Sequence, residues 1–489
     1  MSAKIEREFD VIVIGAGAVG ENVADRVVRG GLTAVLVEAE LVGGECSYWA
    51  CMPSKALLRP GTALHGAQTV PGAEEAVTRT LDAEAVLKRR DYFTDNWQDD
   101  GQAKWVEETG IGLIRGRGRI TGPRAVEVTG LDGVTYLVSA RHAVALATGS
   151  APTAPPVPGL EGLQYWTTRE ATSARSVPRS LAVLGGGVAG TELAQAFARL
   201  GSAVTLVARG ELLSMYPAEA ARLVLAGLRA DGVDVHLNTG TERVSQDDGS
   251  FTVDLADGDS IRAEKLLVAT GRHAALAGLG LESVGFGPTD GKAPSLRTDS
   301  TGLVAGPAGS PDQRESGGQW LYLVGDAAGQ VMLTHQGKYS ARTTGDAIVA
   351  RANGELKGTP APWSRFAQTA NEHAVPNVVF TDPELASVGR SVSQAEKDGY
   401  NVSSVELPIN VSGSSLHSEH YEGWAQLVVD EDREVLLGAT FAGPGVAELL
   451  HAATIAVVGQ VPLDRLWHAV PSYPTISEVW LRLLEKYGL

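Results

Sequence analysis

Two stretches of the chain repeat one pattern that restricts the possible folds more than any other feature of the sequence. Residues 9–40 and 181–210 each begin with a short apolar run, pass through a glycine-rich turn and a segment with helical apolar spacing, and end in a second apolar run. This order is typical of a βαβ unit, whose two strands lie parallel in one sheet beneath the connecting helix. The sequence therefore predicts an α/β protein with two Rossmann-like domains.

The first unit has the residues that a dinucleotide-binding turn requires. Gly15 allows a tight turn after the strand, Gly17 lets a pyrophosphate approach, and Gly20 lets the helix pack on the strand. The N-terminus of the helix then faces the phosphates, where unpaired N–H groups favour an anion. Glu38 ends the second strand about 20 positions later, where a carboxylate can accept hydrogen bonds from ribose hydroxyls. We expect a dinucleotide at this turn.

The second unit repeats the turn with Gly185, Gly187 and Gly190 but ends differently. Two such units imply two dinucleotides, of which we expect one to be held permanently and the other to exchange. No acid ends the second strand, and Arg209 stands there instead. A guanidinium suits a 2′-phosphate, which a carboxylate would repel, so NADPH is favoured over NADH. The alternative is that Arg209 is an ordinary surface residue, in which case NADH remains open.

Further buried strands and a change of pattern organise the rest of the chain. The runs at 143–150 and 265–272 are apolar strands that end in Ala-Thr-Gly, and 320–329 is another strand, followed by a helix. Residues 304–319, rich in Gly, Ser and Pro, are expected to form a surface loop. From about 365 apolar and polar residues alternate, which indicates antiparallel strands, and amphipathic helices follow. The predicted boundaries are 1–160 and 286–360 for the first nucleotide domain, 161–285 for the second, and 361–489 for a C-terminal α+β domain.

The overall composition excludes several classes of protein. The chain has 489 residues and a net charge of −17, which argues against nucleic acid or an anionic membrane as the main partner. No apolar run reaches the ~18 residues that a membrane-spanning helix needs. The N-terminal sequence MSAKIEREFD has none of the features of a signal peptide. We expect a cytoplasmic protein.

Cys46 and Cys51 are the only cysteines of the chain. In a reducing compartment a structural disulfide is unusual, so a close pair indicates redox or metal chemistry. Two thiols alone make a poor metal site, and His451 and His468 show no ligand spacing, so we expect no metal. The residues after Cys51 look like the opening of a helix, whose N-terminus stabilises a thiolate. Such a pair can store two electrons as a dithiol, and the alternative is two small buried apolar residues.

The segment VGGECSYWACMPSK (42–55) resembles the redox-active segment of the class I pyridine nucleotide-disulfide oxidoreductases. This family includes dihydrolipoamide dehydrogenase, glutathione reductase and mercuric reductase, and the likeness covers nearly the whole chain. GAGAVG with Glu38 resembles its FAD site, GGGVAGTE its NAD(P)H site and LVGDAAG its second FAD contact. VFTDPELASVG and YPTISE are similar to its dimerisation domain, so the resemblance implies a homodimer with FAD in the first nucleotide domain and NAD(P)H in the second.

The resemblance also implies a role for each matched residue. Cys51 would lie against the flavin and donate charge to it as a thiolate, while Cys46 would face the substrate and form a mixed disulfide. Lys55 and Glu192 would pair near the flavin and the nicotinamide and tune hydride transfer. Asp326 would bond the ribityl chain or a phosphate. The other implied cofactor-binding residues are Gly15, Gly17, Gly20, Glu38, Gly44, Thr148, Gly149, Gly185, Gly187, Gly190, Arg209, Gly271 and Gly325.

The chain departs from the family at the acid–base position. The family motif is His-Pro-Thr-x-x-Glu, in which the histidine acts on the substrate thiol from the partner subunit. Here Tyr473 replaces the histidine, while Pro474, Thr475 and Glu478 stay in register. A phenol, with an ordinary pKa of about 10 against about 6.5 for histidine, is a poor base at neutral pH but can still donate a proton. His468 could substitute if its loop folds back, or it is an ordinary surface residue.

Two smaller departures concern the walls of the site. Tyr48 and Trp49, between the cysteines, are bulkier than is common in the family. They either line the substrate side and favour flat aromatic substrates, or pack beneath the flavin domain. Val188 stands where related enzymes often have a tyrosine that covers the flavin, so we expect a more open pocket there.

Three functions remain open on this evidence. The first is an NAD(P)H-dependent reductase of a small disulfide. The second keeps the flavin and the cysteine pair but delivers electrons to a quinone, dye, metal ion or oxygen, for which no histidine base is required. The third is a non-catalytic flavoprotein that reports redox state through partners, against which the intact Lys55, Glu192 and cysteine pair argue.

Overall fold

The computed structural model describes residues 4–287, 296–306 and 320–489. They divide into two compact units. Unit 1 comprises Met1–Cys51, Thr94–Pro152 and Arg272–Asn371, and unit 2 comprises Met52–Phe93, Thr153–Gly271 and Glu372–Leu489. The surface loop expected over 304–319 lies, from residue 307 onward, outside the described residues.

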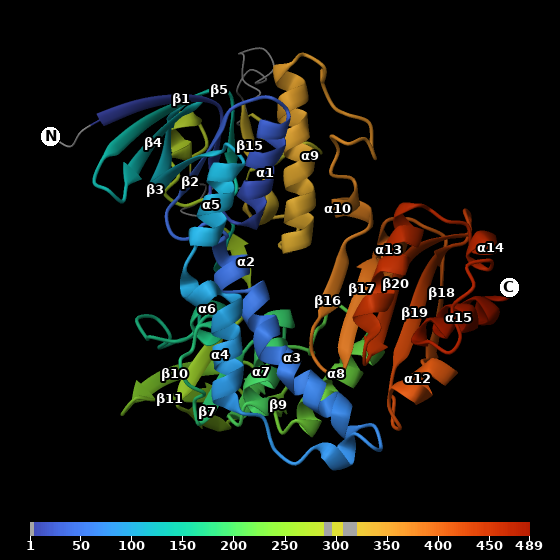
Figure 1. The fold of residues 1–489 in the computed structure, drawn as a ribbon. Helices are drawn as coiled ribbons and strands as arrows, with labels where there is room; N and C mark the ends of the chain where they lie inside the picture. The colour runs from blue at the N-terminus through green and yellow to red at the C-terminus, as the bar shows by residue number, and fades with distance from the viewer. Residues whose placement is uncertain (1–3, 288–295, 307–319) are drawn as a thin grey trace. The chain divides into compact units, whose positions relative to one another are not determined.

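Unit 1 is built on one mixed sheet (Figure 1). Its parallel part runs in the order β3-β2-β1-β5-β15. The chain therefore adds β2 and β3 on one side of β1, and later adds β5 and β15 on the other side. The crevice outside the carboxyl ends of strands at such a reversal is where open α/β sheets bind ligands. β4 joins the ends of β3 and β5 in antiparallel pairing. The strands are β1 (Lys4–Ile14), β2 (Ala34–Glu38), β3 (Gly112–Gly122), β4 (Ala125–Gly130), β5 (Thr135–Leu146) and β15 (Leu321–Leu323), with a separate ladder of β6 (Ser150–Pro152) and β14 (Arg272–Ala274).

The apolar runs of these strands are buried on both faces, as parallel strands require. One face is covered by α1 and α9, which lie side by side in Figure 1 and are joined by an ion pair of 2.6 Å between Arg26 and Asp346. Gly345 lies at their closest approach, because a Cβ there would fall 2.6 Å from the Cβ of Arg26. The helices of the unit are α1 (Ala18–Arg29), α2 (Gly44–Tyr48), α5 (Asp100–Glu108) and α9 (Thr334–Ala352), with single 3₁₀ turns at Asp95–Trp97, Leu281–Val284 and Gly325–Ala328.

Unit 2 contains the second nucleotide-type sheet, which is parallel in the order β13-β7-β8-β9. A three-stranded antiparallel sheet, β10-β11-β12, accompanies it. The strands are β7 (Ser180–Leu184), β8 (Ala203–Val207), β9 (Asp234–His236), β10 (Thr241–Asp247), β11 (Ser250–Leu255), β12 (Ser260–Ala263) and β13 (Lys265–Val268). The helices are α3 (Cys51–Gln68), α4 (Ala83–Phe93), α6 (Thr168–Thr172), α7 (Val188–Arg199) and α8 (Ala218–Ala230), with a 3₁₀ turn at Glu74–Ala76.

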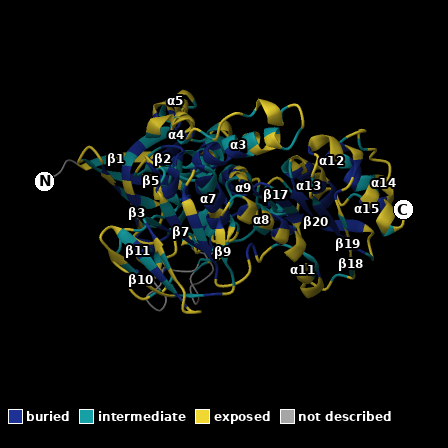
Figure 2. Ribbon diagram, turned by 90° about the horizontal axis from the view of Figure 1, so that it is seen from below, coloured by how far each residue is buried: buried dark blue, intermediate teal, exposed yellow. Residues whose placement is uncertain are grey.

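The C-terminal part of unit 2 is a five-stranded antiparallel sheet in the order β16-β17-β20-β19-β18. β19 and β20 are buried along their whole length (Figure 2). The strands are β16 (Pro376–Val379), β17 (Glu384–Gly389), β18 (Val402–Pro408), β19 (Trp424–Asp430) and β20 (Val435–Gly443). The helices are α10 (Ala370–His373), α11 (Val392–Lys397), α12 (Ser412–His417), α13 (Leu450–Val458), α14 (Leu463–Leu466) and α15 (Val479–Tyr487), with 3₁₀ turns at Val446–Leu449 and Ile476–Glu478.

One apolar cluster links two parts of the chain that the sequence separates. Val379, Leu385 and Trp424 of the C-terminal sheet pack in the same core as Phe197 and Leu206 of the nucleotide sheet. The parts predicted as 161–285 and 361–489 therefore share a core within unit 2. Among the residues described, no helix combines the length and the hydropathy needed to cross a bilayer.

Candidate active site

Two positions of the glycine turn after β1, and one position of α2 that lies against this turn, have room for glycine alone. A Cβ on Gly15, whose φ is +101°, would lie 2.4 Å from the carbonyl oxygen of Ala147. A Cβ on Gly20 would lie 1.9 Å from the carbonyl oxygen of Gly15. A Cβ on Gly44 would fall 2.7 Å from the Cα of Gly17, so the backbone before α2 approaches the start of α1 closely. Side chains are thus excluded around the N-terminus of α1, as a pyrophosphate there would require.

Glu38 lies at the carboxyl end of β2, beside this turn. Its Oε2 accepts a hydrogen bond of 2.7 Å from the backbone N–H of Ala16, and its Oε1 accepts one of 2.7 Å from the backbone N–H of Glu40. Burial raises the pKa of this carboxyl, and the N–H donors oppose the rise. Each oxygen has a further lone pair for a ribose hydroxyl. The glycine turn and this acid together fit the adenosine diphosphate part of FAD.

Asp326, which follows β15, belongs to a polar chain that sequence reasoning only partly found. Its Oδ2 accepts a hydrogen bond of 2.5 Å from the hydroxyl of Ser150, which accepts one of 2.8 Å from Arg272. The same guanidinium donates to the carboxylate of Glu45, next to Cys46. Ser150 and Arg272 directly follow the two Ala-Thr-Gly sequences, and this shared position was the signal that could have identified them.

Backbone conformation determines where the other predicted residues of unit 1 lie. Thr148 donates a hydrogen bond of 2.9 Å from its hydroxyl to the carbonyl of Ala275. Gly149 has φ +72° and Gly325 has φ +67°, in the left-handed region that glycine adopts without strain. A Cβ on Gly325 would lie 2.9 Å from a methyl carbon of Val19 on α1. Gly325 thereby lets the turn that carries Asp326 lie against α1.

The two cysteines lie on neighbouring elements of the chain. Cys51 begins α3, as the sequence predicts, while Cys46 lies in the short helix α2, and the two are not joined by a disulfide in this structure. The Sγ of Cys51 lies 3.2 Å from the hydroxyl oxygen of Thr334, the first residue of α9. The hydrogen bond with Cys51 and burial strongly raise the pKa of the Cys46 thiol. Such a pair gives up its first proton far more readily than its second.

Tyr48 does not line a substrate pocket. Its side chain is fully buried, and its hydroxyl lies 3.1 Å from the carbonyl oxygen of Val42 and 3.2 Å from that of Gln98. Its own carbonyl accepts a hydrogen bond of 3.0 Å from the indole N–H of Trp97. Of the two readings of the sequence, packing within the domain is therefore correct for Tyr48. Trp49 is half-buried, with its ring centroid 5.6 Å from that of Tyr48.

In unit 2, Lys55 and Glu192 form the predicted pair. The Nζ of Lys55 lies 2.7 Å from the Oε2 of Glu192, which is almost fully buried on α7. The Oε1 of Glu192 accepts a hydrogen bond of 2.9 Å from the backbone N–H of Phe380. The ammonium also lies 4.7 Å from the centre of the Phe380 ring. Phe380 was not among the predicted residues, and its sequence position far from both partners carries no signal for the contact.

Helix α7 also holds the segment around Phe380 through two residues that lie one and two turns after Glu192. Gln195 exchanges two hydrogen bonds of 2.8 Å with the backbone of Asp382. The carboxylate of Asp382 accepts hydrogen bonds of 2.9 Å from Arg199 and 2.6 Å from His65. Buried amide and charged groups thus hold α3, α7 and the loop before β17 in one geometry around Glu192.

The second glycine turn repeats the geometry of the first. A Cβ on Gly185, with φ +122°, would lie 2.4 Å from the carbonyl oxygen of Ala269, and one on Gly190 would lie 2.1 Å from that of Gly185. Gly187 faces open space. Val188, half-buried, packs against the apolar core at the start of α7. Gly271, with φ +138°, accepts a backbone hydrogen bond of 2.9 Å from Thr153.

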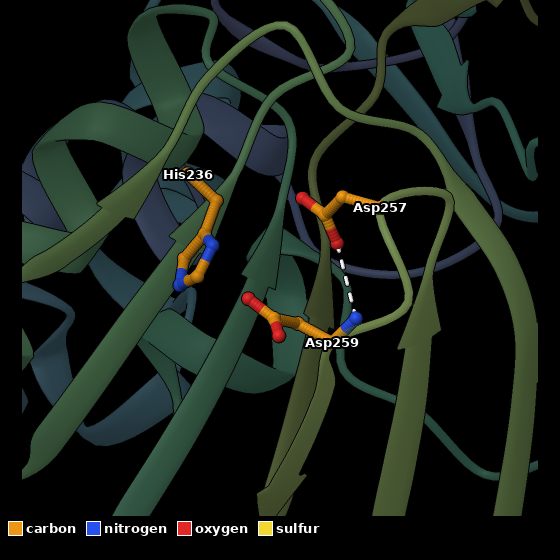
Figure 3. Close-up of side chains that lie close together, drawn as sticks. All are labelled: His236, Asp257 and Asp259. Carbon is orange, nitrogen blue, oxygen red and sulfur yellow. Dashed lines mark hydrogen bonds between the residues drawn. The ribbon is translucent and has the colours of Figure 1, made fainter.

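Arg209 follows β8 and is exposed, and no carboxylate of the described residues lies within 4.0 Å of its guanidinium. Close to the end of that strand, the carbonyl of His236 accepts a hydrogen bond of 2.8 Å from Ala208. The His236 ring lies near Asp257 and Asp259, with ligand-type atoms all within 4.8 Å of one another (Figure 3). Asp257 accepts a hydrogen bond of 3.1 Å from the backbone of Asp259, which is ordinary turn geometry. Both carboxylates are exposed, and we assign no metal to them.

The C-terminal motif separates an exposed residue from a buried one. Tyr473 is 75% exposed, and His468 is exposed as well. Glu478 is buried, and its Oε2 has no hydrogen-bond partner among the residues described. Within the described chain Tyr473, His468 and Glu478 therefore form no hydrogen-bonded group.

Known proteins resemble this chain over almost its whole length. Residues 9–341 match the family described as pyridine nucleotide-disulphide oxidoreductase, and residues 375–483 match its dimerisation domain. Dihydrolipoyl dehydrogenase of Thermus scotoductus is 32% identical over 482 residues, covering 96% of both chains. Mercuric reductase of Streptomyces lividans is 32% identical over 481 residues, covering 96% of this chain and 94% of that protein.

Solved structures agree with the fold. The Cu(II) complex of the HOCl-induced flavoprotein disulfide reductase RclA from Escherichia coli has a TM-score of 0.79 at 22% identity, covering 98% of this chain and 99% of that chain. LpdA from Mycobacterium tuberculosis has a TM-score of 0.79 at 22% identity, covering 98% of this chain and 100% of that one. The predicted α/β fold with two Rossmann-like domains and a dimerisation domain is confirmed. The chain belongs to the pyridine nucleotide-disulphide oxidoreductase family, for which FAD and a pyridine nucleotide are the typical cofactors.

Proposed function

We propose that this enzyme takes an electron pair from NADPH and delivers it, through FAD and the Cys46–Cys51 couple, to a small disulfide. The observation that carries the proposal is the thiol pair itself, with Cys51 at the start of α3 and 3.2 Å from Thr334 at the start of α9. The N-termini of α3 and α9 meet at this contact, and their unpaired N–H groups favour the thiolate form of Cys51. The hydrogen bond with Cys51 and burial raise the pKa of the Cys46 thiol, so the two sulfurs titrate as a coupled pair.

FAD, when bound, accepts a hydride and passes an electron pair on to the thiols. Gly15, Gly17, Gly20 and Gly44 would keep side chains away from its pyrophosphate, and Glu38 would accept from its ribose. Asp326, held by Ser150, would bond the ribityl chain or a phosphate. Lys55 would present its charge near the reacting rings because Glu192 and Phe380 fix its position.

The preference for NADPH rests on Arg209. Its guanidinium is exposed at the end of β8, where the 2′-position of a nucleotide on this fold lies. A charge-assisted hydrogen bond of about 1.5–3 kcal/mol to a phosphate corresponds to roughly a 10- to 150-fold change in affinity. We expect Arg209→Ala to raise the KM for NADPH by such a factor and to leave the KM for NADH within about twofold. Equal changes for both cofactors would remove the argument for NADPH.

The residues of the C-terminal motif would act in a homodimer. Ile455, Val470 and Tyr473 are between 57% and 84% exposed in the single chain, although two of them are apolar. A second copy would cover these side chains, because they lie within the part of the chain that matches the dimerisation domain of the family. Tyr473 and Glu478 would then reach the site of the partner, with the phenol as a hydrogen-bond donor to the substrate.

A second candidate function follows from Tyr473. A phenol is a poor base at neutral pH, so the partner subunit would offer no strong acid–base group to a leaving thiol. An acceptor that takes electrons without a leaving thiol, such as a quinone, dye, metal ion or oxygen, needs none. A non-catalytic redox reporter is a third possibility, which turnover of any acceptor would exclude.

A substrate panel separates these functions. The holoenzyme and its Cys46→Ser variant are supplied with NADPH and, side by side, lipoamide, glutathione disulfide and a quinone. We expect disulfide turnover by the wild type and its loss in Cys46→Ser, with Ser47→Ala as the matched control that keeps both thiols. Fast quinone turnover that survives Cys46→Ser, with negligible disulfide turnover, would establish the second candidate instead.

A further inference from the structure

A cavity of about 440 Å³ opens in unit 1 beside the N-terminal parts of three helices. α1 contributes Glu21 and Asn22 to its wall, α9 contributes Lys338, and α5 contributes Gly101, Gln102 and Trp105. The cavity carries an acid, a base, two amides and one aromatic ring, which is an unusually polar set for a recess between helices. None of these side chains belongs to the glycine turns, to the cysteine pair or to the Lys55–Glu192 pair.

The cavity lies on the same side of α9 as the cysteine pair. Lys338 is four positions after Thr334, so the two side chains share one helix face. Thr334 touches Cys51, and the positive charge of Lys338 acts on the thiol of Cys46. The same charge acts on the carboxyl of Glu21. Lys338 therefore links the cavity acid electrostatically to the substrate-side thiol.

Glu21 has an oxygen that the described protein does not satisfy. Its Oε1 is buried and has no hydrogen-bond partner among the described residues, although buried carboxylate oxygens nearly always have one. Burial raises the pKa of this carboxyl to about 7, against the opposing charge of Lys338. Both protonation states are then present at neutral pH, which suits a group that transfers protons.

The charges that face Glu21 come from several elements. Lys338 lies on α9 and lowers its pKa, while Glu38 at the end of β2 raises it. On α1 itself Asp25 is one turn further on and is paired with Arg29 at 2.8 Å. α5 presents only uncharged groups to the cavity, and the negative charge of Glu21 helps to raise the pKa of the buried Tyr48 phenol on α2.

We propose that Glu21 donates the proton to the thiol that leaves when a disulfide substrate reacts with Cys46, in the place of the histidine that this chain lacks. The inference rests on the proposed function and adds an acid–base residue to it. Unlike the family's histidine, this acid comes from the same subunit as the cysteines. Trp105 and Gln102 would form the wall against which the leaving half of the substrate lies.

The Cys46 thiol passes its proton to the Cys51 thiolate, and the Cys46 thiolate so formed attacks one sulfur of the substrate R–S–S–R′. A Cys46–S–S–R bond forms and the S–S bond of the substrate breaks. The leaving R′S⁻ takes the proton of the Glu21 carboxyl and departs as R′SH. Cys51 then attacks the sulfur of Cys46 and releases RS⁻, which takes the proton that Cys51 held, and Glu21 regains its proton from solvent. The substrate gains two electrons and the cysteine pair becomes the disulfide, which NADPH reduces again through FAD.

The test compares two disulfides whose leaving thiols differ in acidity. Bis(2-hydroxyethyl) disulfide releases an alkyl thiolate that needs a proton, whereas 5,5′-dithiobis(2-nitrobenzoate) releases a far more acidic aromatic thiolate that needs none. We expect Glu21→Gln to lower kcat/KM for the alkyl disulfide by about 100-fold or more, the range of a general acid. Turnover of the aromatic disulfide should stay within about threefold of the wild type. Glu107→Gln, an exposed acid on α5, is the matched control and should change neither.

The pH profile adds a readout that a structural role would not move. Wild-type kcat/KM for the alkyl disulfide should fall above about pH 7, as the carboxyl of Glu21 loses its proton. Glu21→Gln should lack this alkaline fall, and Lys338→Met should move it to higher pH because an opposing charge is removed. If Glu21→Gln fails to retain flavin, Glu21→Asp serves instead, with the fall retained and the alkyl rate reduced.

The outcomes separate the two proposals. Equal losses on both disulfides, or no loss on the alkyl disulfide, would overturn the role of Glu21 while leaving the reductase intact. A wild-type enzyme that is reduced by NADPH but turns over neither disulfide would overturn the proposed function, and this inference with it.

Discussion

The ion pair between Lys55 and Glu192 gives a prediction whose size follows from its surroundings. Lys55→Met, Glu192→Gln and the double variant form a double-mutant cycle. Two unit charges 2.7 Å apart attract by roughly 6 kcal/mol at an effective dielectric constant of 20. Desolvation of Glu192 offsets most of this energy, and the Lys55 side chain, 35% exposed, is screened by solvent. We therefore expect a coupling free energy of about 1–2 kcal/mol.

The two single variants should be unequal. Lys55→Met leaves the buried carboxylate of Glu192 with the Phe380 N–H as its one remaining hydrogen-bond donor among the described residues, which costs about 3 kcal/mol. Glu192→Gln leaves an ammonium that can still reach water, at a cost of about 1–2 kcal/mol. The double variant should cost less than the sum of the two single variants, by the coupling free energy of about 1–2 kcal/mol, because neither charge is then left unpaired.

The assay is urea unfolding of the holoprotein, followed by flavin fluorescence and circular dichroism. Protein and flavin concentrations are held constant, because ligand binding and dimerisation both change apparent stability. Arg222→Met and Glu219→Gln form the control cycle, since this pair on α8 is exposed and 2.7 Å apart. Its coupling should stay below about 0.5 kcal/mol. A Lys55–Glu192 coupling equal to the control, or a costlier Glu192→Gln, would refute the reasoning.

Three further predictions concern the flavin site, pH and the interface. Gly44→Ala should abolish flavin retention on purification, because its Cβ would fall 2.7 Å from the Cα of Gly17 and its φ is +61°. Gly66→Ala, whose Cβ would meet nothing within 4 Å, is the control and should retain a full complement of flavin. The hydrogen bond from Arg141, with further donors from Thr33, holds the pKa of Asp10 well below its usual range. The ionised Asp10 therefore stabilises the fold above its unfolded pKa of about 4, and this stabilisation is lost as the pH falls further. Below pH 4 the melting temperature of Asp10→Asn should therefore fall less steeply than that of the wild type. Ile455→Lys should give a folded monomer in sedimentation velocity, because this side chain is 57% exposed on α13, and an unchanged dimer would exclude α13 from the interface.

The sequence was sufficient for those features that depend on local spacing. Gly15, Gly20, Gly185 and Gly190 occupy the tight positions that their motifs predict, because each glycine is dictated by backbone atoms a few residues away or on the adjacent strand. The start of α3 at Cys51 followed in the same way from the polar and proline residues after it. The pairing of Lys55 with Glu192 came from family resemblance, since nothing local joins positions so far apart.

Other features could not be found from the sequence because they depend on packing between distant segments. Phe380 reaches Glu192 only because Gln195 and Arg199 fix the neighbouring Asp382. Tyr48 is a core residue because Val42 and Gln98 offer carbonyls to its hydroxyl, which no pattern of apolar residues reveals. Glu21 looks like an ordinary acid in the first turn of a helix, and only the fold shows that its oxygen is buried.

The central claim is that the cysteine pair accepts electrons from the pyridine nucleotide through the flavin. An anaerobic titration of the oxidised holoenzyme with NADPH tests it most directly, with the flavin absorbance and the number of alkylated cysteines followed together. We predict that each protomer takes up two electron pairs and that Cys46 and Cys51 become alkylated, whereas Cys51→Ser takes up one pair. Uptake of a single pair by the wild type, with both cysteines unchanged in reactivity, would contradict the account.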